Sequence, residues 1–303
     1  MSGSSAYCEW IAADWGTSTL RAWAMQGTDV LAEVRSNQGM NALEKSAFES
    51  TFIELVEPWL GQGTTPVVAC GMLGARQGWA EAPYRAVPCA PLAGSGVHVA
   101  TKDKRIAVQI LPGLKQSKPA DVMRGEETQI AGFLFDAPGF DGVLCLPGTH
   151  TKWAQISAGE VVSFRSFMTG ELYDLLVHRS VLRHSTGDAW DDTVFYEAVA
   201  DALAKPEALA SRLFNIRAET LLHDLGPGAA AARVSGLLIG SELAAARPYW
   251  LGQEIAVIGP DRLSQLYVSA LKPQGIEAQA VRADAMTRAG LYAAHRSLRE
   301  AAE

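Results

Sequence analysis

The same strand–turn–hairpin pattern occurs twice in this chain, with the two copies about half its length apart. Residues 11–19 read IAADWGTST and residues 143–151 read VLCLPGTHT, so each copy is an apolar run that ends in Gly-Thr-x-Thr. When the copies are aligned on Gly16 and Gly148, the tight turns QGTD at 26–29 and SAGE at 157–160 fall at nearly the same offset. Two copies of one hairpin predict two related half-domains that face each other.

The shared turns have the composition of a phosphate-binding loop. Glycine lets the backbone approach a ligand closely, and the small hydroxyls and exposed amides of such a turn suit phosphate oxygens. The chain lacks both the GxxxxGK[ST] pattern that opens a helix and a GxGxxG pattern after its first strand, which mark two other kinds of nucleotide-binding loop. We therefore expect a polyphosphate held by two β-hairpins. A coincidence of two unrelated Gly-Thr turns is the alternative.

Composition restricts the partners of the chain. Its 303 residues, of which 48% are hydrophobic and 19% charged, are typical of a folded protein of about two domains. The net charge of -7 argues against nucleic-acid binding, which requires clustered Lys and Arg. The four cysteines form no CxxC pair, and the sequence shows neither a signal peptide nor an apolar run of membrane-spanning length. We expect a reduced cytoplasmic protein without nucleic-acid or membrane partners, and a homodimer is left open.

Hydrophobic periodicity predicts strands and helices of an α/β fold. The first half is expected to contain strands near 9–14, 20–25, 29–35 and 66–70, a helix near 44–60 and a long glycine-rich connection at 71–96. The second half is expected to contain a helix from about 121, the repeated unit at 141–166, helices near 170–183, 190–204, 206–215 and 230–247, then strand 254–259, helix 261–272, strand 277–281 and helix 284–302. We place an N-terminal lobe at 1–118, completed by the C-terminal helix 284–303, and a C-terminal lobe at 119–283.

Several segments resemble the motifs of a known superfamily. ADWGTSTLRAW, LPGTHTKW and IAVIGPDRLSQLY look like the phosphate-1, phosphate-2 and adenosine motifs of the actin-like ATPase superfamily of sugar kinases. Within it, DWGTSTLRAW, CGMLGARQGWAEAPY, MRGEETQ, LPGTHTKW and FMTGELYDLL together are similar to the 2-dehydro-3-deoxygalactonokinase family. The resemblance implies a two-lobed, ribonuclease H-like fold with a cleft between the lobes. It also implies phosphorylation of the terminal 6-hydroxyl of 2-dehydro-3-deoxy-D-galactonate in galactonate breakdown, with ATP and Mg²⁺.

The first copy carries a carboxylate that the second copy lacks. Asp14 ends an apolar strand, where an unpaired carboxylate would be costly. We expect it to bind Mg²⁺, which prefers oxygen ligands and bridges phosphate oxygens, although an Asx-type hydrogen bond to the turn is the alternative. Leu146 stands at the matching position of the second copy, so we expect metal on one side and phosphate alone on the other.

The nucleotide is expected to contact both turns and a later strand end. The phosphate-binding residues are expected to be Gly16, Thr17, Ser18, Thr19 and Arg21 in the first copy and Gly148, Thr149, His150, Thr151 and Lys152 in the second. The alternatives are a surface position for Arg21 and an ordinary turn role for His150. Gly259, Pro260 and Asp261 at the end of a strand, with Gly240 in an apolar helix, could let the adenine ring approach, although Gly240 could equally serve helix packing.

The general base is a carboxylate that the motifs do not fix. Such a group normally accepts the proton of the attacking hydroxyl, and many kinases of the superfamily supply an aspartate from the second phosphate motif, which is absent from LPGTHT. The available carboxylates are Glu126, Glu127, Glu171 and Asp174. We expect Glu126 to be the base, because MRGEETQ begins a helix whose amino end should point toward the cleft, and we expect Glu127 on a solvated face.

Substrate binding is expected mainly from the 71–96 connection. It contains Arg76, Gln77, Trp79, Tyr84 and Arg85, and this mixture of cations and flat rings suits a polar keto-acid. Anchoring of the loop by its two rings is the alternative.

Two residues outside that connection complete the expected substrate site. Arg124 could hold the carboxylate of the acid through a bidentate contact. Glu171 is the second residue that we expect to bind the substrate.

The competing functions are phosphorylation of a different sugar or sugar acid, such as the gluconate epimer, and a nucleotide-dependent switch of the actin-like type.

Overall fold

The computed structural model describes residues 7–92, 94 and 96–301, and its contacts divide the chain into two units. Unit 1 comprises residues 1–140, 156–163 and 283–303, and unit 2 comprises residues 141–155 and 164–282. Segment 119–140 and the C-terminal segment therefore both belong to unit 1. Among the described residues, no helix combines the length and apolar character that crossing a membrane requires.

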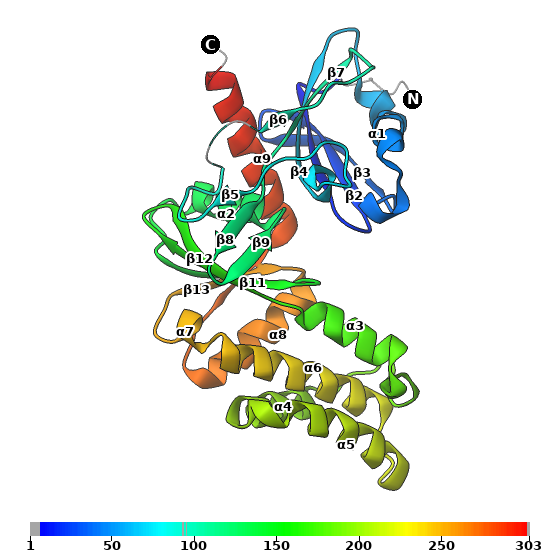
Figure 1. The fold of residues 1–303 in the computed structure, drawn as a ribbon, viewed down its shortest axis with the longest axis vertical. Coiled ribbons are helices and arrows are strands. Elements are labelled where there is room, and N and C mark those ends of the chain that lie inside the picture. The colour runs from blue at the N-terminus through cyan, green and yellow to red at the C-terminus, as the bar shows by residue number, and fades with distance from the viewer. Residues whose placement is uncertain (1–6, 93, 95, 302–303) are drawn as a thin grey trace. The chain divides into compact units, whose positions relative to one another are not determined.

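Unit 1 is built on a mixed sheet that starts with the first copy of the repeat (Figure 1). β1 (Trp10–Trp15), β2 (Leu20–Gln26) and β3 (Asp29–Ser36) are antiparallel neighbours. β4 (Thr65–Gly71) and β7 (Ile106–Ile110) continue the sheet on the other side of β1 as parallel strands, and the short β6 (Val97–His98) ends it. Because β1 and β4 are parallel, their carboxyl ends meet at one edge of the sheet.

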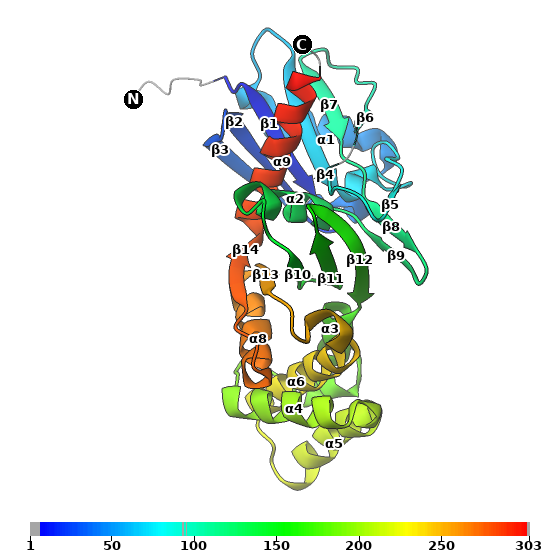
Figure 2. The same ribbon diagram turned by 90° about the vertical axis from the view of Figure 1, so that its left-hand side faces the viewer.

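Both faces of this sheet are covered, so β1 is apolar along almost its whole length. Its alternate side chains Ile11, Ala13 and Trp15 share a core with α1 (Phe48–Val56). The intervening Trp10 and Ala12 share a second core with residues of α9 (Ala283–Glu300), which runs along the sheet in Figure 2. The period-two alternation of a strand thus supplies one set of side chains to each core.

A second helix and a small sheet complete unit 1. α2 (Glu126–Asp136) crosses α9 closely, since a Cβ on Gly132 would lie 1.9 Å from Met286 O and one on Gly290 would lie 1.9 Å from Thr128 O. β5 (Arg85–Ala86), β8 (Leu114–Ser117) and β9 (Ala120–Met123) form a three-stranded sheet. β9 leads directly into α2.

Unit 2 repeats the strand order of unit 1. Its sheet has the order β12 (Glu160–Phe167), β11 (Thr151–Ser157), β10 (Gly142–Leu146), β13 (Ile255–Gly259) and β14 (Gln279–Arg282). β10, β13 and β14 are parallel. In both units the strand before the Gly-Thr turn lies between its own hairpin and a parallel strand from later in the chain. The duplicated sheet that the sequence repeat predicts is therefore present.

The helices of unit 2 pack around one apolar helix (Figure 1). They are α3 (Thr169–Arg179), α4 (Asp192–Ala204), α5 (Leu209–Leu222), α6 (Pro227–Ala245), α7 (Arg247–Trp250) and α8 (Asp261–Leu271). α6 is buried on most of its circumference. A Cβ on Gly236 or Gly240 would lie 2.5 Å from a carbonyl oxygen of α4, so Gly240 serves helix packing, which was one of its two expected roles.

The structure corrects four of the expected elements. The helix expected at 44–60 is α1 over residues 48–56, flanked by 3-10 turns at 45–47 and 57–59, because Pro58 ends the regular helix. The helix expected from about 121 begins only at Glu126, after strand β9. The helix expected at 206–215 covers 209–222. The C-terminal helix ends at Glu300, and residue 302 of the expected helix lies outside the described residues.

Candidate active site

The first Gly-Thr turn lies at the carboxyl end of β1. A backbone hydrogen bond of 2.8 Å from Gly16 N to Thr19 O closes it, and two backbone N–H groups of residues 40–41 donate to the carbonyls of Gly16 and Thr17. Thr17, Ser18 and Thr19 are exposed. The turn therefore holds three hydroxyl side chains at the surface of unit 1 on a backbone that is fixed by hydrogen bonds.

Asp14, just before this turn, forms an ion pair with Arg21. Arg21 Nη2 lies 2.5 Å from Asp14 Oδ2, and its Nη1 binds Asp284 of α9. Desolvation lowers the pKa of Arg21, but the attraction and hydrogen bonds of the two carboxylates more than offset this and raise the pKa. Arg21 is thus a partly buried link between the hairpin and α9, and it does not occupy the surface position that was its alternative role.

The second oxygen of Asp14 faces the end of β4. Asp14 Oδ1 lies 3.9 Å from Cys70 Sγ, and a Cβ on Gly71 would lie 3.2 Å from Oδ1 and 2.6 Å from Trp15 O. Gly71 has a φ of +96°, so glycine is required at this contact. Mg²⁺ that is carried by a nucleotide needs only one or two carboxylates in addition to phosphate oxygens and water, and Asp14 fits that requirement.

Two glutamates at the start of α2 have different environments. Glu126 is half-buried, and its Oε2 accepts a hydrogen bond of 3.0 Å from the backbone N–H of Arg124. Glu127 is 0% exposed, and its carboxylate accepts hydrogen bonds from Gly125 N and Thr128 Oγ1. Desolvation, with a smaller contribution from the charge of Glu126, raises the pKa of Glu127 to about 8.

The expected solvated position of Glu127 is therefore wrong. α2 begins after Gly125, whose φ is +105° and whose added Cβ would lie 3.6 Å from Gly71 Cα. This close approach turns the first helical turn toward β4, where the charges of Asp14 and Glu127 both contribute to the raised pKa of the Cys70 thiol, after desolvation. Two carboxylates thus lie near one buried thiol at the carboxyl ends of β1 and β4.

Arg124 presents a positive charge whose hydrogen bonds are incomplete. Its Nη2 donates to Ala82 O at 2.8 Å, and its guanidinium carbon lies 4.2 Å from the centre of the Tyr84 ring. Its Nε and Nη1 are buried and have no hydrogen-bond partner within the part of the chain that the structure describes. A Cβ on Gly74 would lie 2.8 Å from Nη1, so the glycine leaves room for the guanidinium. Unsatisfied buried donors of this kind favour an anionic ligand.

The other residues expected in the substrate loop differ in exposure. Trp79 is 9% exposed and packs against Trp15 and Phe52, at ring-centroid distances of 6.2 and 6.0 Å. It thus anchors the loop on the core, which was its alternative role. Arg76 and Gln77 are exposed, and Arg76 lies 3.7 Å from Glu81.

The second Gly-Thr turn packs against the start of α3 in unit 2. A Cβ on Gly170 would lie 2.2 Å from Gly148 O, and the backbone N–H of Glu171 donates to Thr149 O at 2.9 Å. Glu171 also pairs with His150, with 2.6 Å between Oε2 and Nε2. The expected phosphate turn and Glu171, which was expected in the substrate site, are therefore one packed substructure.

Three further expected positions have other neighbours. Lys152 is 4% exposed within β11, and Thr151 bonds the hydroxyl of Tyr267 at 2.9 Å. Asp174 is exposed and pairs with His178 at 2.9 Å. The side chains of Lys152, Thr151 and Asp174 therefore do not lie on the exposed surface of the second Gly-Thr turn.

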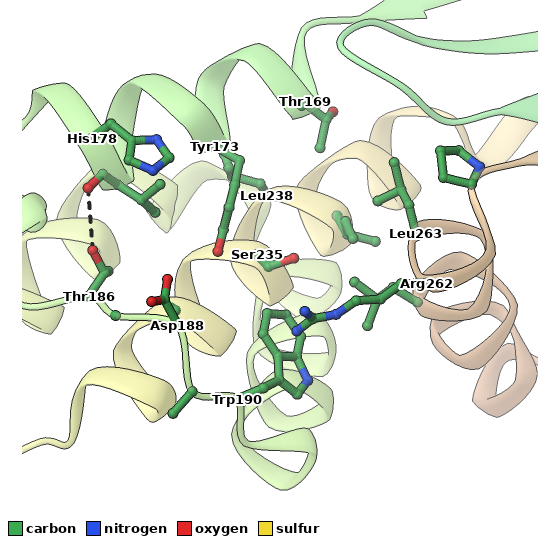
Figure 3. Close-up of a pocket in the computed structure, with 18 of the residues that line it drawn as sticks. Thr169, Tyr173, His178, Thr186, Asp188, Trp190, Ser235, Leu238, Arg262 and Leu263 are labelled. Carbon is green, nitrogen blue, oxygen red and sulfur yellow. Dashed lines mark hydrogen bonds between the residues drawn. The ribbon is translucent and has the colours of Figure 1, made fainter. Parts of the chain in front are cut away.

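A cavity of about 850 Å³ opens beside this turn, entirely within unit 2. Its wall contains Gly148 and Gly170 at one end, Pro260 and Arg262 from the start of α8, and side chains of α3 and α6. In Figure 3, Tyr173, Ser235, Trp190 and Arg262 surround its middle part. The guanidinium carbon of Arg262 lies 4.9 Å from the centre of the Trp190 ring.

The cavity has the size and the mixed lining of a small-molecule binding pocket. Of the residues expected near adenine, Pro260 lines it, whereas Gly259 is buried beside Pro147, with 3.0 Å between an added Cβ and Pro147 Cγ. Sequence reasoning did not find Tyr173, Trp190 or Arg262, because they come from three separate helices and loops and share no motif.

The repeated sheet, the two Gly-Thr turns and the pocket beside one of them define an α/β protein of the actin-like ATPase and sugar kinase fold class. The chain belongs to the 2-keto-3-deoxy-galactonokinase family of phosphotransferases, whose model matches residues 14–294. Membership of this kinase family implies that ATP is the phosphoryl donor.

Known relatives agree with this family over nearly the full length. The chain is 34% identical over 285 residues to the 2-dehydro-3-deoxygalactonokinase of Escherichia coli (strain K12), covering 93% of this chain and 96% of the relative. It is 39% identical to "Probable 2-dehydro-3-deoxygalactonokinase DgoK1" of Rhizobium meliloti (strain 1021), covering 95% and 96%.

Solved structures agree as well. A crystal structure from Sinorhizobium meliloti, provisionally named as a 2-dehydro-3-deoxygalactonokinase, superimposes with a TM-score of 0.89 at 37% identity, covering 95% of this chain and 99% of that one. The activator of 2-hydroxyisocaproyl-CoA dehydratase from Clostridium difficile, with bound ADPNP, shares the fold at a TM-score of 0.52 and 11% identity, covering 96% and 97%.

Proposed function

We propose that this chain transfers the γ-phosphoryl group of ATP to the terminal 6-hydroxyl of 2-dehydro-3-deoxy-D-galactonate, in the cytoplasm and with Mg²⁺. The family name supports the substrate, and the free state of all four cysteines fits a reducing compartment. The observation that carries the proposal is the buried guanidinium of Arg124, two of whose nitrogens have no hydrogen-bond partner among the residues that the structure describes. The positive charge of this guanidinium can pair with the carboxylate of a sugar acid, whereas a neutral sugar offers no negative group to pair with it.

In this proposal unit 1 binds the acid and the metal. Arg124, held by Tyr84 and by Ala82 O, forms a charge-assisted pair with the substrate carboxylate. Asp14 would provide the carboxylate that holds Mg²⁺, and a bound Mg²⁺ would supply positive charge to offset the charge of the phosphates. The hydroxyls of residues 17–19 bind phosphate oxygens.

Glu126 is the proposed general base. It is half-buried and lies two residues from Arg124, whereas Glu127 is fully enclosed and has no surface from which to reach a hydroxyl. In the reaction the hydroxyl oxygen bonds to the γ-phosphorus while the bond from that phosphorus to the β,γ-bridging oxygen breaks. ADP leaves with the bonding electron pair, and the hydroxyl proton passes to Glu126.

Unit 2 is proposed to bind the nucleoside and part of the polyphosphate. The cavity beside Gly148 offers the ring of Trp190 and apolar side chains of α6 to the base, and the backbone of the second turn to the phosphates. An aromatic ring in such a pocket supplies a large contact area at a small entropy cost.

A coupled ADP-release assay tests this function. The galactonate-derived acid, its gluconate epimer and galactose should be supplied in parallel. We expect turnover of an acid and none of galactose, which lacks the carboxylate. ADP release that is independent of any acceptor would instead favour a nucleotide-dependent switch, and turnover of galactose would contradict the proposed role of Arg124.

The variant Arg124→Ala tests the acid site itself. A hydrogen bond between charged groups contributes about 1.5–3 kcal/mol, so the KM for the acid should rise by about 10–100-fold while the KM for ATP stays within about twofold. Arg76→Ala, in the 71–96 connection and exposed, shows whether a second arginine shares the role. Equal effects of Arg124→Ala on both substrates would reject the carboxylate assignment.

A further inference from the structure

α6 contains a buried carboxylate that the proposed reaction does not use. Glu242 is 3% exposed in a helix whose other buried residues are apolar or small. Burying a carboxylate is costly unless it is hydrogen-bonded, so a group at this position must be held by several partners.

The partners of Glu242 come from three other elements. Its Oε1 accepts a hydrogen bond of 2.7 Å from Trp153 Nε1 in β11. Its Oε2 accepts hydrogen bonds from Tyr267 OH in α8, at 2.9 Å, and from Thr169 Oγ1 at the start of α3. Because the only proton of the Tyr267 hydroxyl is donated to Glu242, Thr151 donates to Tyr267.

These partners stand on both sides of the second Gly-Thr turn. Thr151 is the first residue of β11 after the turn, and Thr169 immediately precedes Gly170, which packs against Gly148. Gly148, Thr169, Gly170 and Tyr267 all line the cavity. The carboxylate of Glu242 therefore lies behind the part of the cavity wall that the second Gly-Thr turn, the start of α3 and Tyr267 of α8 form. It bonds Thr169 and Tyr267 directly, and it is connected to Thr151 through the hydroxyl of Tyr267.

We propose that Glu242 is a positioning residue for the nucleotide site, which holds the second Gly-Thr turn and the start of α3 in register by binding Thr169 directly and Thr151 through Tyr267. This inference rests on the proposed binding of nucleotide in unit 2. Desolvation raises the pKa of Glu242 to about 7, and the hydrogen bonds that Thr169, Trp153 and Tyr267 donate oppose that rise. The network thus stabilises a carboxylate that burial alone would neutralise.

Three variants of the full chain separate positioning from folding. Glu242→Gln replaces an acceptor oxygen with a donor, while Thr169→Val and Tyr267→Phe each remove one hydroxyl and keep the shape. Thr220→Val is the matched control, because Thr220 Oγ1 donates to Ile216 O of its own helix, α5, at 2.9 Å. Each variant is assayed for the Kd of ADP by calorimetry, for KM of ATP and of the acid, and for its melting temperature.

We expect Thr169→Val and Tyr267→Phe to raise the Kd of ADP and the KM of ATP at least fivefold, with the KM of the acid within twofold and with Thr220→Val unchanged. Hydrogen exchange at residues 148–151 and 169–171 should be faster in both variants than in the control. Unchanged ADP binding in folded variants, or equal changes in both KM values, would overturn the inference. If the wild-type chain itself does not bind ADP, the proposed function fails, and this outcome is distinct from variants that bind as well as wild type.

Discussion

Gly170→Ala is the sharpest steric perturbation of the proposed nucleotide site. The added Cβ would lie 2.2 Å from Gly148 O and 3.0 Å from Gly148 C and from Thr149 Cα. Backbone atoms cannot approach a Cβ so closely, so the start of α3 and the second turn must separate by about 1 Å. Forcing such a contact costs about 1–3 kcal/mol of stability. A misplacement of about 1 Å at a reacting site can reduce the rate about 100-fold, which corresponds to about 2.7 kcal/mol of transition-state stabilisation.

Two other glycines of unit 2 provide the controls. A Cβ on Gly148 or on Gly226 meets no atom within 4 Å, so alanine at either position should leave the melting temperature nearly unchanged. Gly148 lines the cavity, whereas Gly226 precedes α6 and does not. Gly148→Ala should therefore raise the KM for ATP at unchanged stability, and Gly226→Ala should change neither quantity.

The assay measures kcat and both KM values below the melting temperature of each variant. We expect Gly170→Ala to lower kcat/KM for ATP by about 100-fold, Gly148→Ala to raise the KM for ATP, and the KM for the acid to change little in either. Wild-type kinetics in a folded Gly170→Ala protein would refute the reasoning, because that result would mean that the position of the turn does not matter. An effect of Gly226→Ala as large as that of Gly148→Ala would show that the cavity is not involved.

Two further predictions concern unit 1. The pKa of Glu127 is raised from 4.5 to about 8, so the folded state keeps a proton that the unfolded state releases, and stability falls as pH rises through that interval by at most about 1.4 kcal/mol per pH unit. Between pH 5.5 and 7.0, the unfolding free energy of Glu127→Gln should therefore rise by about 2 kcal/mol relative to that of wild type, as measured by urea unfolding. If the unfolding free energies of both proteins have the same pH slope, the raised pKa of Glu127 is contradicted. Asp14→Asn should lower kcat at least about 100-fold in an ADP-release assay at saturating Mg²⁺ and still fold, whereas Asp284→Asn, which removes the other partner of Arg21, should keep most of the activity. Near-normal turnover by Asp14→Asn would remove Asp14 from the metal role.

Features that depend on short stretches of sequence were predictable. The two IAADWGTST-like segments fixed two equivalent strand–turn–hairpin units, because a period-two apolar run and a glycine turn are local properties. The sequence also placed Asp14 directly before the first turn and Glu126 at the start of a helix. The strands at 254–259 and 277–281 were expected for the same reason and were found as β13 and β14.

Features that depend on contacts between distant segments were not predictable. Glu127 looks like an ordinary surface glutamate, but it is buried where the start of α2 lies against Gly71 of β4. Glu242 in the apolar run SGLLIGSEL was a visible signal of a buried charge, but its partners lie 25 to 89 positions away in the sequence and no motif connects them. The convergence of the two Gly-Thr turns on one nucleotide stays a prediction from the sequence.

The sequence by itself determined the duplicated architecture, the family and the identity of the two turns, because these follow from local patterning and from motifs that can be aligned. Only the tertiary structure decided which charges are paired and which are free to bind a ligand. Arg21 and Arg124 were both expected to bind an anion of the ligands, yet the first is bound to two carboxylates and the second has two buried nitrogens without a partner among the described residues. Pairing depends on which side chains the fold brings within about 3 Å of each other, and that distance is a property of packing between elements that are remote along the chain.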